Sequence, residues 1–283
     1  MDYTSDSGAK RFGFFWLSFV PLLLYWGIMT GVVTVMECVI AFFASLRGQG
    51  DLLQYVGSGL VENGMIGGVF YATIGILFLG LWYYFGCRHR DFHVGRKVFR
   101  PGTVIAIFLM ALAMQYLCSC VVSVAGELLP KAMESYETLM EDNGVGEITA
   151  FGILYGVILG PIAEELCFRG VTLYYAKRAF RWFWVANIFQ AVLFGVMHLN
   201  LIQGLYAAFL GLFIGWVYER FHSIYASAML HILFNLLAYG PLNTIDRLFQ
   251  KTGNIYHFWP VIALVILILV IGFLVIRTRR EKE

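Results

Sequence analysis

Residues 153–170 read ILYGVILGPIAEELCFRG, an apolar run followed at once by two glutamates and an arginine. Apolar runs of this kind are typical of membrane-spanning helices, in which a charged side chain at mid-depth costs roughly 2.5–3.5 kcal/mol even on a lenient scale. Glu164, Glu165 and Arg169 therefore raise the question of what the chain gains by placing three charges there.

The composition of the whole chain indicates a polytopic membrane protein. Of its 283 residues, 60% are hydrophobic and only 13% are charged, whereas soluble domains contain roughly 25% charged residues. A membrane span needs about 20 predominantly apolar residues. The sequence therefore predicts an all-α transmembrane helical bundle that forms a single membrane domain over residues 1–283. We expect about eight spans, at residues 13–45, 64–87, 103–125, 148–176, 183–200, 203–220, 224–240 and 258–277.

The charges between the spans predict an orientation. Basic residues precede the first span and follow the second, fourth and eighth, whereas the loop after the third span is acidic. The positive-inside rule then places both termini in the cytoplasm, and we expect a multi-pass protein of the cell (plasma) membrane. Because the basic residues lie at span ends, we expect the lipid bilayer as a partner and no nucleic acid. Residues 126–147, in the acidic loop, are expected to form an amphipathic surface helix.

The fourth predicted span contains the densest cluster of charges. Glu165 and Arg169 are four residues apart with the glutamate first, which is the favourable order for an ion pair along a helix. Glu164 points about 100° away from Glu165 around the helix, and Pro161 removes a backbone hydrogen bond just before the pair. Two interpretations remain open: a functional cluster inside the bundle, or an interfacial charge cluster at the cytoplasmic end of the helix.

The fifth predicted span carries polar residues on one helical face. Asn187, Gln190, Phe194 and His198 follow one another at helical spacing. For the two amides the simpler interpretation is interhelical hydrogen bonding, which contributes about 0.6 kcal/mol on average in membranes. The histidine at the end of this face is harder to explain by structure alone.

The seventh predicted span repeats this pattern with Ser227, His231 and Asn235, which are four residues apart. A single buried histidine is more often a core residue than a catalyst. His231 and Asn235 weaken that interpretation because both offer hydrogen-bond donors to the same point.

The sixth predicted span explains how the polar helices can approach one another. Small residues form a stripe along one face, and such stripes let membrane helices pack closely. They are Gly204, Ala208, Gly211 and Gly215.

The polar set as a whole suits the hydrolysis of an amide bond by water. This reaction needs a base that activates water and donors that stabilise the oxyanion. Glu164 and His198 suit the first task, and His231 with Asn235 suits the second. A glutamate and two histidines are also the ligand set of a hydrolytic zinc site, which here would consist of Glu164, His198 and His231. The cofactor prediction thus leaves two alternatives, none or a divalent metal such as zinc, although no H-E-x-x-H motif occurs.

Three motifs in this order resemble those of the CPBP family of intramembrane proteases, which are also called CAAX proteases, Rce1-like or Abi proteins and include bacteriocin-processing enzymes. The motifs are Glu164-Glu165-x-x-x-Arg169, Phe194-x-x-x-His198 and His231-x-x-x-Asn235. The resemblance covers residues 150–240, which we expect to be the catalytic core, formed by spans four to seven.

The resemblance implies an intramembrane endopeptidase that cleaves a membrane-associated or lipidated peptide or protein, either in CAAX-type or in bacteriocin-type processing. It implies that Glu164 activates water together with His198, and that His231 and Asn235 bind the oxyanion, with Glu165 and Arg169 completing the site. Family members have been described as glutamate proteases and as metalloproteases, and the motifs do not separate the two.

Two other classes of function remain as alternatives. A membrane scaffold or bacteriocin immunity factor would keep the motifs without catalysis. A transporter would also place ionisable residues in the membrane, but the sequence shows no inverted repeat of broken helices.

One expectation conflicts with the others. On the predicted span boundaries, His198 lies toward the outer end of a short fifth span, whereas Glu164 and His231 lie nearer mid-depth. Either the boundaries are shifted or the helices are tilted.

Overall fold

The computed structural model describes residues 7–46, 60–87, 98–142, 149–239 and 259–280. Within these ranges the chain is helical and contains no β-strand, which confirms the predicted all-α bundle. The N-terminal half consists of α1 (Gly8–Leu17), α2 (Val20–Leu46), α4 (Leu60–Trp82), η1 (Tyr83–Cys87), α6 (Pro101–Leu128) and α7 (Pro130–Asp142). The C-terminal half consists of α8 (Ala150–Gly152), η3 (Ile153–Leu159), α9 (Gly160–Glu165), η4 (Leu166–Thr172), α10 (Leu173–Phe180), α11 (Phe183–Met197), α12 (Leu201–Phe221), α13 (Ile224–Tyr239) and α15 (Trp259–Arg280).

Among the described residues, 6 helical segments are long and apolar enough to cross a membrane. They correspond to the first, second, third, fourth, sixth and eighth predicted spans. The fifth and seventh are the apolar helices α11 and α13, of 15 and 16 residues. At 1.5 Å per residue these helices measure only about 22–24 Å, less than the roughly 30 Å of a bilayer's hydrocarbon core. Both short helices carry motif residues.

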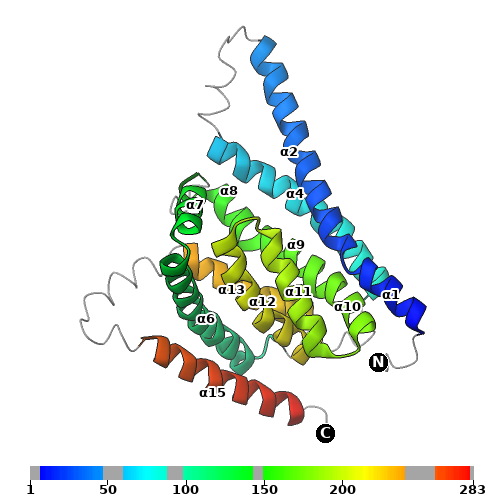
Figure 1. Ribbon diagram of the computed structural model, residues 1–283, viewed down its shortest axis with the longest axis vertical. Helices are drawn as coiled ribbons and strands as arrows, with labels where there is room; N and C mark the ends of the chain where they lie inside the picture. Colours follow the sequence, from blue (N-terminus) through cyan, green and yellow to red (C-terminus); the bar gives the residue numbers. More distant parts are fainter. Residues whose placement is uncertain (1–6, 47–59, 88–97, 143–148, 240–258, 281–283) are drawn as a thin grey trace.

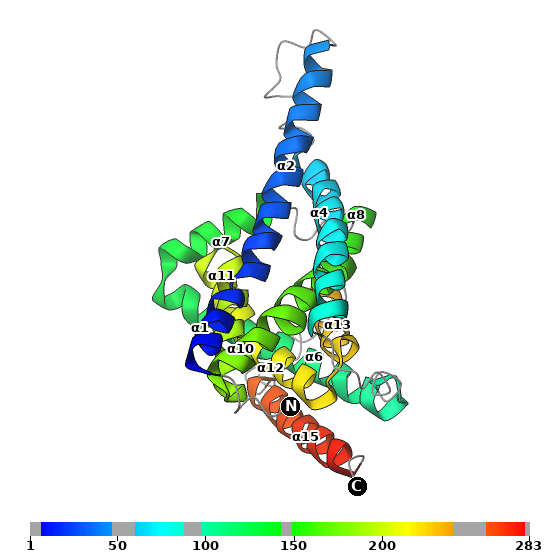
Figure 2. The same cartoon turned by 90° about the vertical axis from the view of Figure 1, so that its right-hand side faces the viewer.

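The helices form three groups (Figures 1 and 2). Helices α8 to α13 form the central group, with α1, α2 and α4 on one side and α6 and α15 on the other. One apolar core joins α6, α12, α13 and α15, and a second joins α2, α4, η4 and α11. The central helices thus contribute to both cores, and their polar faces lie between the two.

Contacts between helix ends bring the basic residues to one end of the bundle. The Arg11 guanidinium donates to the Ala179 carbonyl at 2.9 Å, and Arg220 donates to the Val275 carbonyl at 3.0 Å. The Arg277 side chain lies beside Gly102 at the start of α6. The start of α1 and the end of α15 lie at this same end in both views (Figures 1 and 2). The start of α1 and the end of α15 therefore lie at one end of the bundle, and the assignment of that end to the cytoplasm stays a prediction.

The amphipathic surface helix expected within residues 126–147 corresponds to α7, which ends at Asp142. Its Tyr136 ring lies 6.3 Å from the Tyr206 ring of α12, measured between centroids. Residues 143–148 lie outside the described ranges.

The fourth span is one continuous helix from Ala150 to Phe180 that contains two π-helical segments, in which the hydrogen-bond register differs from that of an α-helix. The α-helical turn α9, which carries both glutamates, lies between the π-helical segments η3 and η4. A π-helical turn adds a residue per turn and is frequent at functional sites. Pro161, which has no N–H to donate to a preceding turn, is the second residue of α9, after Gly160. The register change therefore decides where the glutamates point.

The small residues of α12 pack against α11, as predicted. A Cβ atom on Gly204 would lie 3.0 Å from the Gly195 carbonyl oxygen, and one on Gly211 would lie 3.3 Å from the Cα of Ala191. The two helix backbones are thus in direct contact. Gly31 on α2, in contrast, has no atom within 4 Å of a Cβ added there.

We expect Gly195→Val to destabilise the protein by about 1–3 kcal/mol, because overpacking forces the helices apart. Gly31→Val, in a span but facing open space, is the matched control and is expected to change little. Thermal unfolding in detergent micelles measures both. Equal melting temperatures for the two variants would contradict the close α11–α12 contact.

Candidate active site

The centre of the polar region is a buried ion pair in the fourth span. Arg169 Nη1 donates to Glu165 Oε1 at 2.8 Å, and both side chains are 0% exposed. Arg169 Nη2 donates to the Gly211 carbonyl of α12 at 3.1 Å, and the guanidinium lies 4.6 Å from the centre of the Phe194 ring. The charge of Arg169 is therefore balanced by a carboxylate, a carbonyl and an aromatic face. This placement excludes the interfacial charge cluster for Glu165 and Arg169.

His231 of α13 joins this pair from the opposite side. Its Nδ1 lies 3.0 Å from Glu165 Oε1. A carboxylate oxygen only accepts hydrogen bonds when ionised, so Nδ1 carries the proton and donates. The Nε2 atom then faces Glu164, whose Oε2 lies 3.7 Å away. The imidazole of His231 thus lies between the two neighbouring carboxylates.

Glu164 differs from Glu165 in its surroundings. Its side chain is 15% exposed, whereas that of Glu165 is completely buried. The 100° between adjacent helical positions points Glu165 at Arg169 and leaves Glu164 at the edge of the cluster. Of the two carboxylates, Glu164 is therefore the one that a water molecule or a substrate can reach.

His198 lies directly after α11 and is half-buried. Its Nδ1 is 2.9 Å from the Phe194 carbonyl oxygen. Since a carbonyl only accepts, Nδ1 donates this bond, and Nε2 of the neutral ring keeps a free lone pair. The Phe194 ring lies edge-on against both histidines, at 5.1 Å from His198 and 5.6 Å from His231 between centroids. Both imidazoles therefore pack against the Phe194 ring.

Asn235 is held by a different part of the fourth span. Its Nδ2 donates to the Gly156 carbonyl of η3 at 2.8 Å. An amide nitrogen carries two hydrogens, so one N–H remains for another acceptor. Asn235 is therefore oriented by the register change that precedes the glutamates.

The fourth span is longer at its end than predicted, which bears on the conflict over the position of His198. It reaches Phe180, four residues beyond the expected end at residue 176. Counted from the turn after Phe180, Glu164 and His198 therefore lie a similar number of residues along their helices. The depth of both residues in the membrane stays a prediction.

Three tyrosines beside Glu164 were missed by sequence reasoning. The hydroxyls of Tyr71 on α4 and Tyr155 on η3 are in hydrogen-bonding contact, and the ring of Tyr25 on α2 lies 5.9 Å from that of Tyr71. All three are within electrostatic range of the Glu164 carboxylate. They belong to no motif, and only their polar hydroxyls within apolar spans could have indicated them.

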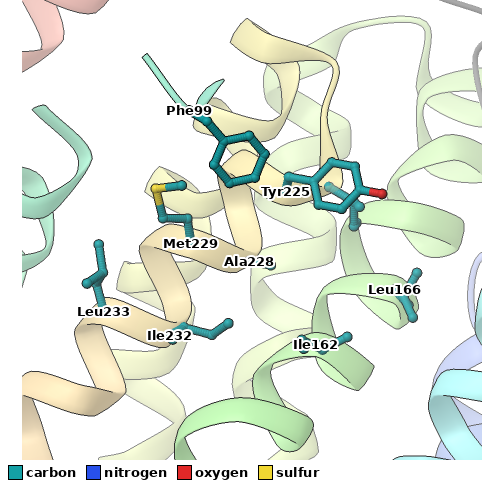
Figure 3. Close-up of a pocket in the computed structure, with 9 residues that line it drawn as sticks. Phe99, Ile162, Leu166, Tyr225, Ala228, Met229, Ile232 and Leu233 are labelled. Atoms are coloured by element: carbon teal, nitrogen blue, oxygen red, sulfur yellow. The ribbon is translucent and has the colours of Figure 1, made fainter. Parts of the chain in front are cut away.

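An apolar cavity of about 410 Å³ lies between the fourth span and α13, and the residues that line it are all uncharged. Ile162 and Leu166, which precede and follow the glutamates in the sequence, face Ile232 across it (Figure 3). Figure 3 shows Phe99 and Tyr225 together at one end of the cavity. The remaining lining residues are Ile224, Ala228, Met229 and Leu233. The cavity suits a hydrocarbon group and contributes almost no polar surface.

The expected metal ligands do not form a metal site. Among the side chains that the structure describes, no three from histidine, cysteine, aspartate and glutamate are placed to hold one ion. Nδ1 of His198 and Nδ1 of His231 donate hydrogen bonds, which leaves Nε2 of each ring as the nitrogen that could bind a metal. Between the described side chains of Glu164 and His198 there is no hydrogen bond or ion pair. The set Glu164, His198 and His231 therefore does not fit a zinc ion in this arrangement.

Comparison with known families finds a match for the central part of the chain. Residues 146–237 match the family described as type II CAAX prenyl endopeptidase, Rce1-like. This match confirms the resemblance of the three motifs to the CAAX proteases and supports, at a general level, an intramembrane endopeptidase of the CAAX type. No curated protein and no solved structure shows a significant match.

We expect Arg169→Met to destabilise the protein by about 3–5 kcal/mol, because it leaves the buried Glu165 carboxylate without its partner. The control is Lys177→Met, which breaks the less deeply buried ion pair of Lys177 with Glu219, whose side chains are 13% and 25% exposed, and which should cost less than Arg169→Met. Denaturant unfolding in micelles measures both. Similar losses in the two variants would contradict the central role of the buried pair.

Proposed function

We propose that this member of the CAAX protease family cleaves a peptide bond in a membrane-associated substrate, with a water molecule activated at Glu164. The observation that supports the proposal most strongly is the 3.7 Å distance between Glu164 Oε2 and His231 Nε2. Both atoms are hydrogen-bond acceptors when His231 is neutral, since its proton is on Nδ1. A water molecule donating to both would satisfy them and keep its lone pairs for a carbonyl carbon.

The reaction then uses Glu164 as the base and afterwards as the acid. The water oxygen bonds to the scissile carbonyl carbon while Glu164 takes one of the water protons. The tetrahedral intermediate carries a negative charge on the former carbonyl oxygen. Glu164 returns its proton to the amide nitrogen, the C–N bond breaks, and a carboxylic acid and an amine leave.

The remaining motif residues orient or stabilise these steps. Glu165 accepts the Nδ1 proton of His231 and so keeps Nε2 turned toward Glu164, in the manner of the carboxylate in a catalytic triad. The free Nε2 of His198 is a second acceptor for a water proton. The remaining N–H of Asn235 would stabilise the oxyanion. His231, expected beside Asn235 at the oxyanion, is thus assigned to the water instead.

The surroundings of the site favour a substrate with an apolar portion. The cavity between the fourth span and α13 is lined by apolar side chains, two of which, Ile162 and Leu166, come from the span that carries the glutamates (Figure 3). This agrees with CAAX-type processing of a lipidated protein, while a bacteriocin-type peptide remains the alternative substrate. We also propose that the end of the bundle with the basic residues, and with it both termini, faces the cytoplasm at the plasma membrane.

We expect Glu164→Gln and His198→Ala to lower the cleavage rate by at least about 100-fold, since each removes a group that handles the water proton. Glu37→Gln, on the exposed face of α2, is the matched control and should retain full activity. The measurement uses a farnesylated CAAX peptide with a fluorophore and quencher, in proteoliposomes. Size-exclusion chromatography is the control that tests whether each variant is folded.

Full activity of Glu164→Gln would refute the assignment. If the wild-type protein leaves the CAAX peptide intact, membrane peptides from cells with the wild type and with Glu164→Gln are compared by mass spectrometry. Peptides that accumulate only in the variant identify a different substrate. A Glu164/His198 double variant that restores a deletion phenotype in full would favour a scaffold over a protease.

Chelators are expected to leave cleavage unchanged, because the described side chains offer no three-ligand site. The test compares activity before and after dialysis against a strong chelator, together with the metal content of the purified protein. Stoichiometric zinc whose removal abolishes cleavage would show that the site rearranges to bind metal.

A further inference from the structure

A chain of buried hydrogen bonds continues from the Glu165–Arg169 pair into α11. The Gly211 carbonyl, which accepts from Arg169 at 3.1 Å, also accepts from Gln190 Nε2 at 3.1 Å. Gln190 Nε2 donates in addition to Asn187 Oδ1 at 2.8 Å. Both amide hydrogens of Gln190 are therefore used, and one of them meets the arginine at a shared oxygen.

Asn187 fixes the far end of this chain. Its Nδ2 donates to the Leu212 carbonyl at 2.9 Å, so its oxygen must face Gln190. Asn187, Gln190, Arg169 and Glu165 are all 0% exposed. In such surroundings an unpaired polar group is costly, and Gln190 Oε1 is already a buried atom without a hydrogen-bond partner among the described residues. The two bonds that Gln190 Nε2 donates are therefore what hold its amide in place.

The glycines of α12 make room for this arrangement. A Cβ atom on Gly215 would lie 2.7 Å from Gln190 Nε2 and would overlap Asn187 Oδ1. The missing side chain at 215 thus serves the polar groups of α11 as well as helix contact. The small-residue stripe has a second role that its spacing alone does not indicate.

We propose that Gln190 is a positioning residue for His231. Gln190 and Arg169 hold the same Gly211 carbonyl, Arg169 holds Glu165, and Glu165 holds the Nδ1 proton of His231. Without the Gln190 amide, the Gly211 carbonyl keeps Arg169 as its side-chain donor and loses the second one. The guanidinium is then free to shift on this carbonyl, and Glu165, which is bound to it, shifts as well. Nε2 of His231 then loses its direction toward Glu164. The consequence for cleavage rests on the proposed function, but the orientation of His231 does not.

The chain provides a control of the same chemistry. Gln115 on α6 also donates its side-chain amide to a backbone carbonyl of another helix, that of Phe234 in α13. It has no bond to Arg169 or Glu165. Gln190→Met and Gln115→Met therefore each remove one interhelical amide–carbonyl contact, and only the first touches the proposed chain.

The experiment reads the His231 ring directly by ¹⁵N NMR of histidine-labelled full-length protein in micelles, with the signal assigned by its loss in His231→Gln. Wild type and Gln115→Met should show the tautomer with the proton on Nδ1. Gln190→Met should show a mixture of tautomers, and its kcat should fall about tenfold with KM unchanged, as is typical when a group behind a reacting residue is removed. Gln115→Met should keep the wild-type kcat.

Gly215→Ala displaces the amides of Asn187 and Gln190 without removing them. It should also give a mixture of His231 tautomers and a lower kcat, so it replaces Gln190→Met in the test if that variant does not fold. An unchanged His231 signal in a folded Gln190→Met or Gly215→Ala variant would overturn the positioning role. An equally large change of the His231 signal in Gln115→Met would also overturn it. The loss of any interhelical hydrogen bond would then be enough to reorient His231. If the wild-type protein cleaves nothing, the NMR comparison still decides the inference, and the failure belongs to the proposed function alone.

Discussion

A carboxylate and a guanidinium held without water at the centre of an apolar bundle are the constraint on which the rest of this structure depends. An ionised group alone in such surroundings is very costly, and even a pair needs good geometry and further hydrogen bonds. Glu165 and Arg169 meet part of this requirement at 2.8 Å along one helix turn, although Glu165 Oε2 and Arg169 Nε are buried without a hydrogen-bond partner among the described residues. Their remaining partners come from other helices: the Gly211 carbonyl, the Phe194 ring and His231. Satisfying one ion pair thus brings four helices together.

The close approach of the helices follows from this need. Gln190 reaches the Gly211 carbonyl because α11 and α12 are in backbone contact, and that contact requires glycines at 195 and 204. Arg169 of the fourth span binds the same carbonyl. Tyr25 and Tyr71 of the N-terminal helices lie within electrostatic range of Glu164, and α6 and α15 pack on α12 and α13 through an apolar core.

Two neighbouring glutamates acquire different properties from this geometry. Glu165 is bound by Arg169 and His231 and has no exposure, so its task is to hold its partners. Glu164 is partly exposed and faces the free nitrogen of His231. One carboxylate is therefore held by its partners, and the other is partly open to water. This difference is compatible with the proposed proteolytic site, in which the reacting group must meet water.

The sequence by itself determined the membrane class, the all-helical fold, the motif residues and the Glu165–Arg169 pair, because hydropathy and helical spacing depend only on neighbours along the chain. It did not indicate that His231 lies between both glutamates, that Asn235 binds Gly156, or that Tyr25, Tyr71 and Tyr155 surround Glu164. Those contacts join residues far apart in sequence, and two π-helical segments rotate the fourth span by amounts that no spacing rule contains. Only the tertiary structure decided them, because the direction of a side chain around a membrane helix is set by the helices packed against it.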